Sequence, residues 1–375
     1  MSDPGAAARR VAAPVPSARS AGPAAPRAPG ASGPGHWSTD SGPRITTSSY
    51  DPPRWLRNPH VQSVLGSSPL RRRVGQKALA SMDATHHAHT VDGGEGIRLA
   101  GCHSVPAGDP RGLVLLLHGW EGSIDSSYMR LTAAALLARG FEVFRLNFRD
   151  HGETHHLNEA LFHSNRLDEV VHATRDVIQR LAVPRGLPVA VAGYSLGGNF
   201  ALRLGLRGPG AGIDLAHVCA VCPVLDPSRT MDAMEQGLPL YLWYFEKKWR
   251  GSLARKRELF PDSHAFDDAT LRLRMRALTR WMVERHTDFD TLDHYFDGYT
   301  IDGDRLASIA VTTSILMAED DPVIPVDAFR ALTLPAHATV EISPWGGHCG
   351  FLQNARLEGY AEQWIARRIA DAMPA

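Results

Sequence analysis

The sequence predicts an α/β protein built on a mostly parallel sheet. Short continuous apolar runs alternate with amphipathic segments along most of the chain, a pattern typical of parallel strands covered by helices on both faces. In addition, the turn Gly193-Tyr-Ser-Leu-Gly197 stands directly between an apolar run and a helical segment. The 375 residues are enough for one large domain with an insertion.

Residues 1–44 differ in composition from the rest of the chain. Ala, Pro, Gly and Ser supply 31 of these 44 residues, and no hydrophobic periodicity is present. Such a segment buries too little apolar surface to offset its ordering entropy, so we predict a disordered, solvated tail. Its five arginines and two acids also resemble an organelle transit peptide, which is the less favoured interpretation. The folded domain is expected at 45–375.

The predicted strands follow in chain order. A hairpin is expected around the turn signal Asp92-Gly93-Gly94. Helices are expected near 128–139, where Gly140 would end the helix, and over 167–181, where apolar residues recur at helical spacing. The strand segments are 86–91, 97–105, 113–117, 141–147, 189–192, 217–222, 311–317 and 339–342.

The alternation breaks in the second half of the chain. A loop as long as the stretch between the strands ending near Cys222 and beginning at Val311 would be implausible, so we predict a mostly helical cap at about 224–305. Apolar and aromatic residues fill 238–245, where Trp243 and Tyr244 are candidate substrate-binding residues. Six basic residues follow, namely Lys247, Lys248, Arg250, Arg255, Lys256 and Arg257. Two interpretations stay open: the segment contacts lipid, giving at most weak peripheral membrane contact, or it packs the cap onto the sheet with a solvated basic face.

Ser195 is the predicted nucleophile. Gly193-Tyr194-Ser195-Leu196-Gly197 has the strand–turn–helix context that a G-x-S-x-G nucleophile elbow requires. The glycines remove the Cβ atoms that would collide in so tight a turn, and the helix N-terminus favours negative charge beside the hydroxyl. The pentapeptide also occurs by chance, so the context carries the prediction.

A serine hydroxyl needs a base, and the base needs an acid to orient it. His348 is the expected base, because it follows the last strand in a loop that Gly346 and Gly347 make adaptable. Asp321 is the expected acid, four residues before the proline of a D-x-x-x-P sequence, and Asp320 is the alternative. The order serine, acid, histidine is the one that this type of elbow uses.

The oxyanion hole is expected from two backbone N–H groups. One belongs to Leu196, the residue after the nucleophile. The other is assigned to Trp120 in His118-Gly119-Trp120-Glu121-Gly122, which follows the strand 113–117. His118 itself is interpreted as a residue that braces this loop.

Composition and residue spacing argue against several classes of partner and cofactor. Lys plus Arg equals Asp plus Glu at 40 each, so no net charge favours nucleic acid as a partner. Four cysteines fit a reducing cytoplasm, and Cys219 and Cys222 lie on a strand where packing is the favoured role. Neither a metal site at zinc spacing nor a phosphate-binding glycine loop is present, so no metal and no cofactor is expected. No apolar stretch is long enough for a transmembrane segment.

Several motifs together resemble the YheT-like branch of the α/β hydrolases. They are Trp55-Leu-Arg-Asn-Pro-His-Val-Gln-Ser63, His118-Gly-Trp-Glu-Gly122, Gly193-Tyr-Ser-Leu-Gly-Gly-Asn199, Asp320-Asp-Pro322 and Gly346-Gly-His-Cys-Gly-Phe351. The resemblance runs from about residue 50 to the C-terminus. It implies an α/β-hydrolase fold and hydrolysis of short- to medium-chain acyl esters or monoacylglycerols.

We therefore expect a serine hydrolase that cleaves carboxylic esters, as an esterase or lipase, through an acyl-enzyme. A thioesterase or an acyltransferase would use the same triad. A non-catalytic binding scaffold is the alternative from another class, although such scaffolds normally lose the serine, the histidine or the elbow glycines.

Overall fold

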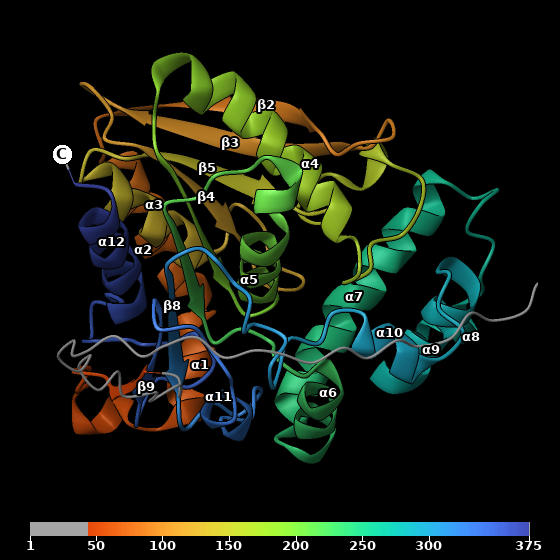
Figure 1. Ribbon diagram of the computed structural model, residues 1–375. Coiled ribbons are helices and arrows are strands. Elements are labelled where there is room, and N and C mark those ends of the chain that lie inside the picture. The colour runs from red at the N-terminus through yellow and green to blue at the C-terminus, as the bar shows by residue number, and fades with distance from the viewer. Residues whose placement is uncertain (1–43, 375) are drawn as a thin grey trace, which may run out of the picture. The chain divides into compact units, whose positions relative to one another are not determined.

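A single sheet organises residues 44–374, the part of the chain that the computed structural model describes. Within these residues the sheet has nine strands in the order β1-β9-β8-β7-β6-β4-β5-β3-β2 (Figure 1). The strands are β1 (Arg44–Thr47), β2 (Ala84–Asp92), β3 (Arg98–Pro106), β4 (Leu113–Leu117), β5 (Glu142–Asn147), β6 (Val189–Tyr194), β7 (His217–Val221), β8 (Thr313–Ala318) and β9 (Ala338–Ser343). Apart from Arg44, the predicted tail lies outside the described residues.

The strand directions confirm the predicted α/β class. From β5 through β4, β6, β7, β8 and β9 to β1 every neighbouring pair is parallel. The hairpin of β2 and β3 is antiparallel, with Asp92 opposite Arg98 across the predicted turn, and β3 pairs antiparallel with β5. All five residues of β4 are buried, as expected for a parallel strand covered on both faces.

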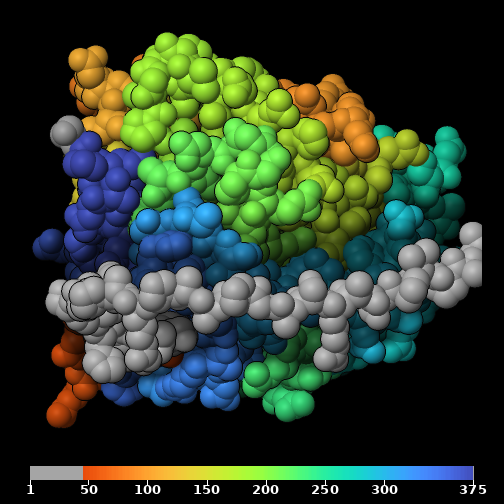
Figure 2. Space-filling model, viewed as in Figure 1, coloured from red at the N-terminus to blue at the C-terminus, as the bar shows by residue number. Residues whose placement is uncertain are grey.

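Helices pack on both sides of this sheet. Helices α2, α3 and α12 pack together, α4 packs against α5, and Figure 1 shows the two groups on opposite faces. Figure 2 shows the segment around α4 (yellow-green) beside the β2–β3 hairpin (orange), which it also contacts in the fold. These helices are α2 (Pro69–Ala80), α3 (Ser127–Leu137), α4 (Leu167–Val177), α5 (Leu196–Arg207) and α12 (Tyr360–Ala372).

The chain between β7 and β8 is helical. Figure 1 shows its helices gathered at one side of the sheet, in green to cyan. They are α6 (Pro227–Gln236), α7 (Pro239–Leu259), α8 (Asp268–Leu271), α9 (Met275–His286) and α10 (Leu292–Asp297). We call residues 224–305 the cap. The short helix α11 (Asp327–Arg330) follows β8.

Three elements near the N-terminus were not predicted. Strand β1 extends the sheet by pairing with β9, and helices α1 (Pro59–Gly66) and α2 precede β2. Asn58 begins α1 by accepting hydrogen bonds from the N–H groups of His60 and Val61, and Pro59 occupies the first helical position. Asn58 and Pro59 are helix-start signals that can be read in the sequence. They lie inside the motif Trp55–Ser63, for which hydrophobic periodicity predicted no helix.

Candidate active site

Ser195 lies in a strained turn between β6 and α5. Its backbone has φ 53° and ψ −119°, a left-handed conformation that costs a non-glycine residue about 1–3 kcal/mol. A Cβ atom on Gly193 would lie 2.1 Å from the carbonyl oxygen of Gly197, and one on Gly197 would lie 2.3 Å from that of Leu117. Only glycine fits at either position, so the sequence imposes the elbow that presents the Ser195 hydroxyl at the sheet edge.

His348 contacts both predicted partners. Its Nε2 lies 3.0 Å from Ser195 Oγ, and its Nδ1 lies 2.9 Å from Asp321 Oδ2. Both distances are within normal hydrogen-bonding range. Three side chains that are far apart in the sequence therefore form one continuous chain of polar contacts.

The two neighbouring aspartates have different partners. Asp321 is fully buried, and its Oδ1 accepts hydrogen bonds from the N–H groups of Val323 and Ile324 at 2.8 and 3.0 Å, which leaves Oδ2 for the imidazole. Asp320 Oδ1 instead accepts the N–H of Gly347 at 2.8 Å. Burial raises the pKa of Asp320 to about 6. Asp321 thus contacts the ring of His348, whereas Asp320 contacts the backbone of the loop that carries it.

Ser63 of α1 is a supporting residue that the sequence argument missed. Its Oγ accepts the backbone N–H of His348 at 2.9 Å and donates to the carbonyl of Pro59 at 2.7 Å. A Cβ atom on Gly347 would lie 2.4 Å from the same carbonyl. The loop that carries His348 therefore packs directly against the start of α1. The motif Trp55–Ser63 was recognised as a family signature, and its position against this loop gives it a physical role.

The charges around the imidazole favour its protonated form. Burial alone would lower the pKa of His348, but the Asp321 carboxylate, together with the negative charge that the neighbouring Cys349 bears when ionised, holds it well above its usual range. A histidine in this setting binds a proton more tightly than a free imidazole.

The predicted oxyanion donors also face the site. Trp120 and Leu196 line the same cavity as Ser195 and His348. Within residues 44–374, no hydrogen bond uses either backbone N–H, so both are available to a ligand. His118 has the bracing role expected for it: its Nε2 accepts the N–H of Phe148 at 3.2 Å, its Nδ1 contacts the carbonyl of Gly119 at 2.8 Å, and burial lowers its pKa to about 4.

The cavity over Ser195 lies between the sheet edge and the cap. Its volume is about 190 Å³. Most of the cap side chains around it are apolar, as ligand pockets commonly are. They include Met231, Met234, Phe245, Trp249, Met282 and Phe296. Phe245 stacks on Trp120 with ring centroids 5.4 Å apart, and Trp249 meets the same indole edge-on at 5.4 Å.

Of the two predicted substrate-binding residues, the structure brings only Tyr244 to the cavity. Trp243 does not line it: its side chain is 54% exposed, and the Lys247 ammonium lies 5.1 Å from its ring. The helical period explains the correction. Residues 244, 245, 248 and 249 share the inner face of α7, so Trp243 must point outward.

The basic residues of α7 are also not the free cationic face that lipid contact would need. Four of the six pair with acids, and Lys248 donates to the carbonyl of Glu121 at 2.6 Å. The pairs are Arg250–Glu246, Arg255–Glu153, Lys256–Asp150 and Arg257–Asp268. Ion pairs within the fold therefore engage four of these six basic side chains. Within residues 44–374, no helix is long and apolar enough to cross a membrane.

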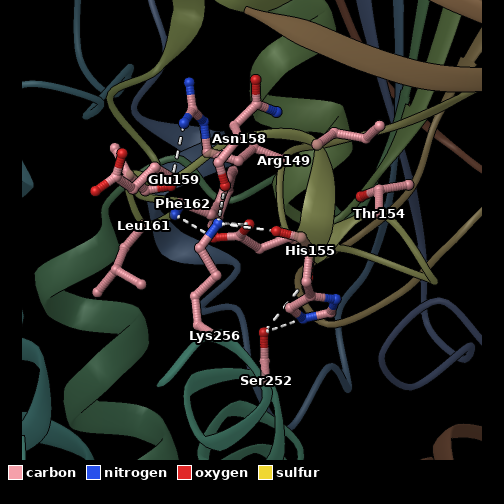
Figure 3. A network of polar contacts seen from close by, with 12 residues as sticks. Arg149, Thr154, His155, Asn158, Glu159, Leu161, Phe162, Ser252 and Lys256 are labelled. Atoms are coloured by element: carbon pink, nitrogen blue, oxygen red, sulfur yellow. Dashed lines mark hydrogen bonds and ion pairs between the residues drawn. The ribbon is translucent and has the colours of Figure 1, made fainter. Parts of the chain in front are cut away.

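The ion pair of Lys256 with Asp150 is the most deeply buried of these four. The Lys256 side chain is 1% exposed, and Nζ lies 2.7 Å from Asp150 Oδ1. Figure 3 shows the ammonium converging with backbone carbonyls of the loop after β5: Nζ donates to that of His155 at 3.1 Å and to that of Asn158. The carboxylate also accepts the N–H of Phe162. This contact fastens the last turn of α7 to the loop after β5.

Comparison with known proteins identifies the family. Residues 114–360 match the family model described as "Alpha/beta hydrolase family". The chain is 26% identical over 344 residues to "Putative esterase YheT" of Escherichia coli (strain K12), covering 89% of this chain and 95% of that protein. It is 32% identical over 133 residues to "Monoacylglycerol lipase" of Mycolicibacterium smegmatis (strain ATCC 700084 / mc(2)155), covering 34% of this chain and 45% of that protein.

A solved structure agrees in fold. The Pyrobaculum calidifontis esterase superposes with a TM-score of 0.53 at 17% identity, covering 87% of this chain and all of that chain. The predicted YheT-like branch and the predicted hydrolase fold are both confirmed by these matches. Together they support a hydrolase that acts on esters in the broad sense.

Proposed function

Because this chain belongs to the alpha/beta hydrolase family, we propose that it hydrolyses carboxylic esters with Ser195 as nucleophile, His348 as general base and Asp321 as orienting acid. One observation carries the proposal: a single imidazole lies 3.0 Å from the Ser195 hydroxyl and 2.9 Å from the Asp321 carboxylate. That is the arrangement a serine needs to become nucleophilic at neutral pH.

In the acylation step, Ser195 Oγ attacks the ester carbonyl while His348 Nε2 takes the hydroxyl proton. The carbonyl oxygen becomes an oxyanion, which the N–H groups of Trp120 and Leu196 stabilise. The bond to the alkoxy oxygen then breaks, and the alcohol leaves with the proton that His348 returns. The products of this step are the free alcohol and an acyl group on Ser195.

Water completes the cycle. His348 removes a proton from a water molecule, and the oxygen attacks the acyl carbonyl. When the bond to Ser195 Oγ breaks, the serine recovers the proton and the carboxylic acid leaves. Asp321 stabilises the imidazolium in both steps without itself taking up the proton.

We propose short- to medium-chain acyl esters or monoacylglycerols as substrates. The apolar cap side chains around the cavity would favour an aliphatic acyl chain, since each buried methylene contributes about 0.8 kcal/mol. The likeness to a monoacylglycerol lipase over 133 residues supports the second choice. Any peripheral membrane contact would rest mainly on the exposed apolar side chains of α7, Leu240 and Trp243, because four of the six basic residues pair with acids.

The test is a series of p-nitrophenyl esters of increasing acyl length, assayed with the wild type and with Ser195→Ala. We expect the substitution to lower kcat by on the order of 10⁴-fold or more, since the triad acts as a unit. The melting temperature should stay close to that of the wild type, because the hydroxyl is presented at a turn rather than packed. A well-folded variant that retained a tenth of the activity would overturn the serine mechanism. Absence of hydrolysis of every ester by the wild type would favour a binding scaffold.

A further inference from the structure

Two cysteines meet directly behind His348. Cys349 follows the histidine in its loop, and Cys222 follows the last residue of β7. Cys349 Sγ donates to the carbonyl of Val221 at 3.8 Å, and Cys222 Sγ donates to the carbonyl of Gly347 at 4.0 Å. Each thiol therefore lies against backbone that flanks the other cysteine, since Val221 directly precedes Cys222 and Gly347 lies two residues before Cys349.

Both cysteines have unusual backbone conformations. Cys222 has φ 43° and Cys349 has φ 56°, in the left-handed region that non-glycine residues seldom adopt. Each such position costs about 1–3 kcal/mol, and residues of this kind concentrate at functional sites. Neither thiol takes part in the ester hydrolysis proposed above. Two strained cysteines therefore lie beside His348 without a role in that reaction.

The two thiols differ in access and in acidity. Cys349 lines the substrate cavity, whereas Cys222 is completely buried. Burial raises the pKa of Cys222. Burial would do the same for Cys349, but the neighbouring Cys222 thiol and the charge of His348, whose Nε2 is 4.0 Å from the sulfur, lower its pKa. Thiolates rather than thiols are the nucleophiles, so Cys349 is the thiol that would react first.

We propose that Cys349 is a site of oxidation by small hydroperoxides, and that Cys222 resolves the oxidised sulfur into a disulfide that inactivates the enzyme at His348. This role adds to the packing function predicted for Cys222 from the sequence, since its side chain is also fully buried in the hydrophobic core. Cys219, three residues earlier on β7, keeps a packing role because it is buried and its pKa is also raised.

The chemistry balances with hydrogen peroxide as the oxidant. The Cys349 thiolate attacks one peroxide oxygen, the O–O bond breaks, and the departing hydroxide takes the proton of His348 as water. The Cys349 sulfenic acid then meets the thiol of Cys222. As the new S–S bond forms, the S–O bond breaks and hydroxide leaves with the thiol proton as a second water. Two thiols lose two electrons in total, and one peroxide is reduced to two waters.

The disulfide would act on catalysis through the histidine loop. A disulfide holds its sulfurs about 2.0 Å apart and restricts the rotation of both side chains. Cys349 is covalently joined to His348, whose Nε2 must stay within hydrogen-bond distance of Ser195. Drawing Cys349 toward β7 moves the imidazole away from the geometry that proton transfer requires.

The test compares the reduced protein before and after treatment with hydrogen peroxide, which catalase then removes. We expect the wild type to lose about 2 Da, to yield a peptide that links Cys222 to Cys349, and to lose more than about 90% of its esterase activity. Dithiothreitol should restore both mass and activity. Cys349→Ala should neither form the link nor lose the activity it had before treatment.

Two further variants separate the roles of the thiols. Cys222→Ala, or Cys222→Ser if alanine folds poorly, should gain about 16 or 32 Da on Cys349 and recover incompletely with dithiothreitol. Cys219→Ala is the matched control from the same strand and should behave as the wild type does.

Equal inactivation of Cys349→Ala and wild type would overturn the proposal, and so would an oxidised wild type without the Cys222–Cys349 link. The inference uses the proposed function only for its activity measurement. If the chain had no esterase activity, the mass measurement would still report the link, so the two failures are distinguishable.

Discussion

The sheet edge and the cap line the same cavity but are held in different ways. At the sheet edge, His348 is fixed by directional contacts: its imidazole contacts Ser195 and Asp321, and its backbone N–H donates to the Oγ of Ser63. On the cap side, Phe245 and Trp249 reach the cavity by packing on the indole of Trp120. Hydrogen bonds require a set distance and angle, whereas apolar packing tolerates substitutions of similar volume.

We therefore expect the sheet edge and the cap to contribute differently to catalysis, stability and substrate preference. Small changes at the sheet edge should remove catalysis, because proton transfer depends on positions to within a fraction of an ångström. Changes in the cap should alter stability or substrate preference by smaller factors. The following predictions test that division.

The largest effect is expected at the two neighbouring aspartates. Asp321→Asn should lower kcat by about 10³- to 10⁴-fold, because the amide neither holds the right imidazole tautomer nor stabilises the imidazolium. Asp320→Asn is the matched control and should remain within roughly tenfold of the wild type, since its contact is to the N–H of Gly347 rather than to the ring. Steady-state kinetics on one ester measures kcat for both variants and shows which aspartate is the triad acid. The reverse ranking would make Asp320 the triad acid.

The next effect concerns the attachment of the cap. Lys256→Met should lower the free energy of unfolding by about 3–5 kcal/mol, because it leaves the buried Asp150 carboxylate without its partner. Burial already raises the pKa of Asp150 and lowers that of Lys256, so each charge depends on the other. Urea denaturation measures the loss.

The control for that prediction is Arg255→Met on the same helix. Arg255 pairs with Glu153 at 2.7 Å, but the two side chains are 45% and 82% exposed. Such a pair contributes about 0–1 kcal/mol. Equal losses for the two variants would mean that the buried pair does not anchor the cap.

A smaller effect is expected from two adjacent residues of α7. Tyr244→Ala should reduce kcat/KM for decanoate relative to butyrate esters by about 1–2 kcal/mol, or roughly tenfold, because the ring lines the cavity. Trp243→Ala should leave that ratio unchanged, since its side chain points to solvent. A changed ratio for Trp243→Ala would restore the acyl-pocket role that the structure removes from it.

The smallest effect is a displaced pH profile. General-base catalysis needs the neutral imidazole, so kcat/KM should rise with pH as His348 loses its proton. Since Asp321 and Cys349 raise the pKa of His348, the rise should lie above pH 6.5, near which a free histidine titrates. Removing one negative group should lower that pKa, so Cys349→Ala should shift the rise to lower pH. A rise at or below pH 6.5 in the wild type, or an upward shift in the variant, would contradict the arrangement of charges.

Much of the fold was predictable because its signals are local. Continuous apolar runs identified the parallel strands, since a strand covered on both faces has no polar side. The elbow at Ser195 was predictable for the same reason: the two glycines are required by backbone collisions within one turn. The D-x-x-x-P spacing pointed to Asp321, the aspartate that the structure places against His348.

Other features depended on contacts between distant segments. No local pattern shows that Ser63 supports His348, that β1 pairs with β9, or that the basic residues of α7 find acidic partners elsewhere. Trp243 and Tyr244 look alike in sequence, and only the orientation of α7 over the sheet decides which of them faces the cavity. The approach of Cys222 and Cys349 to each other's flanking backbone is of the same kind. By itself the sequence determined the strands, the elbow and the candidate triad, because strand burial and backbone collisions act between near neighbours. Tertiary structure alone decided which face of each helix meets the site, because side chains from different segments become neighbours only when the sheet assembles.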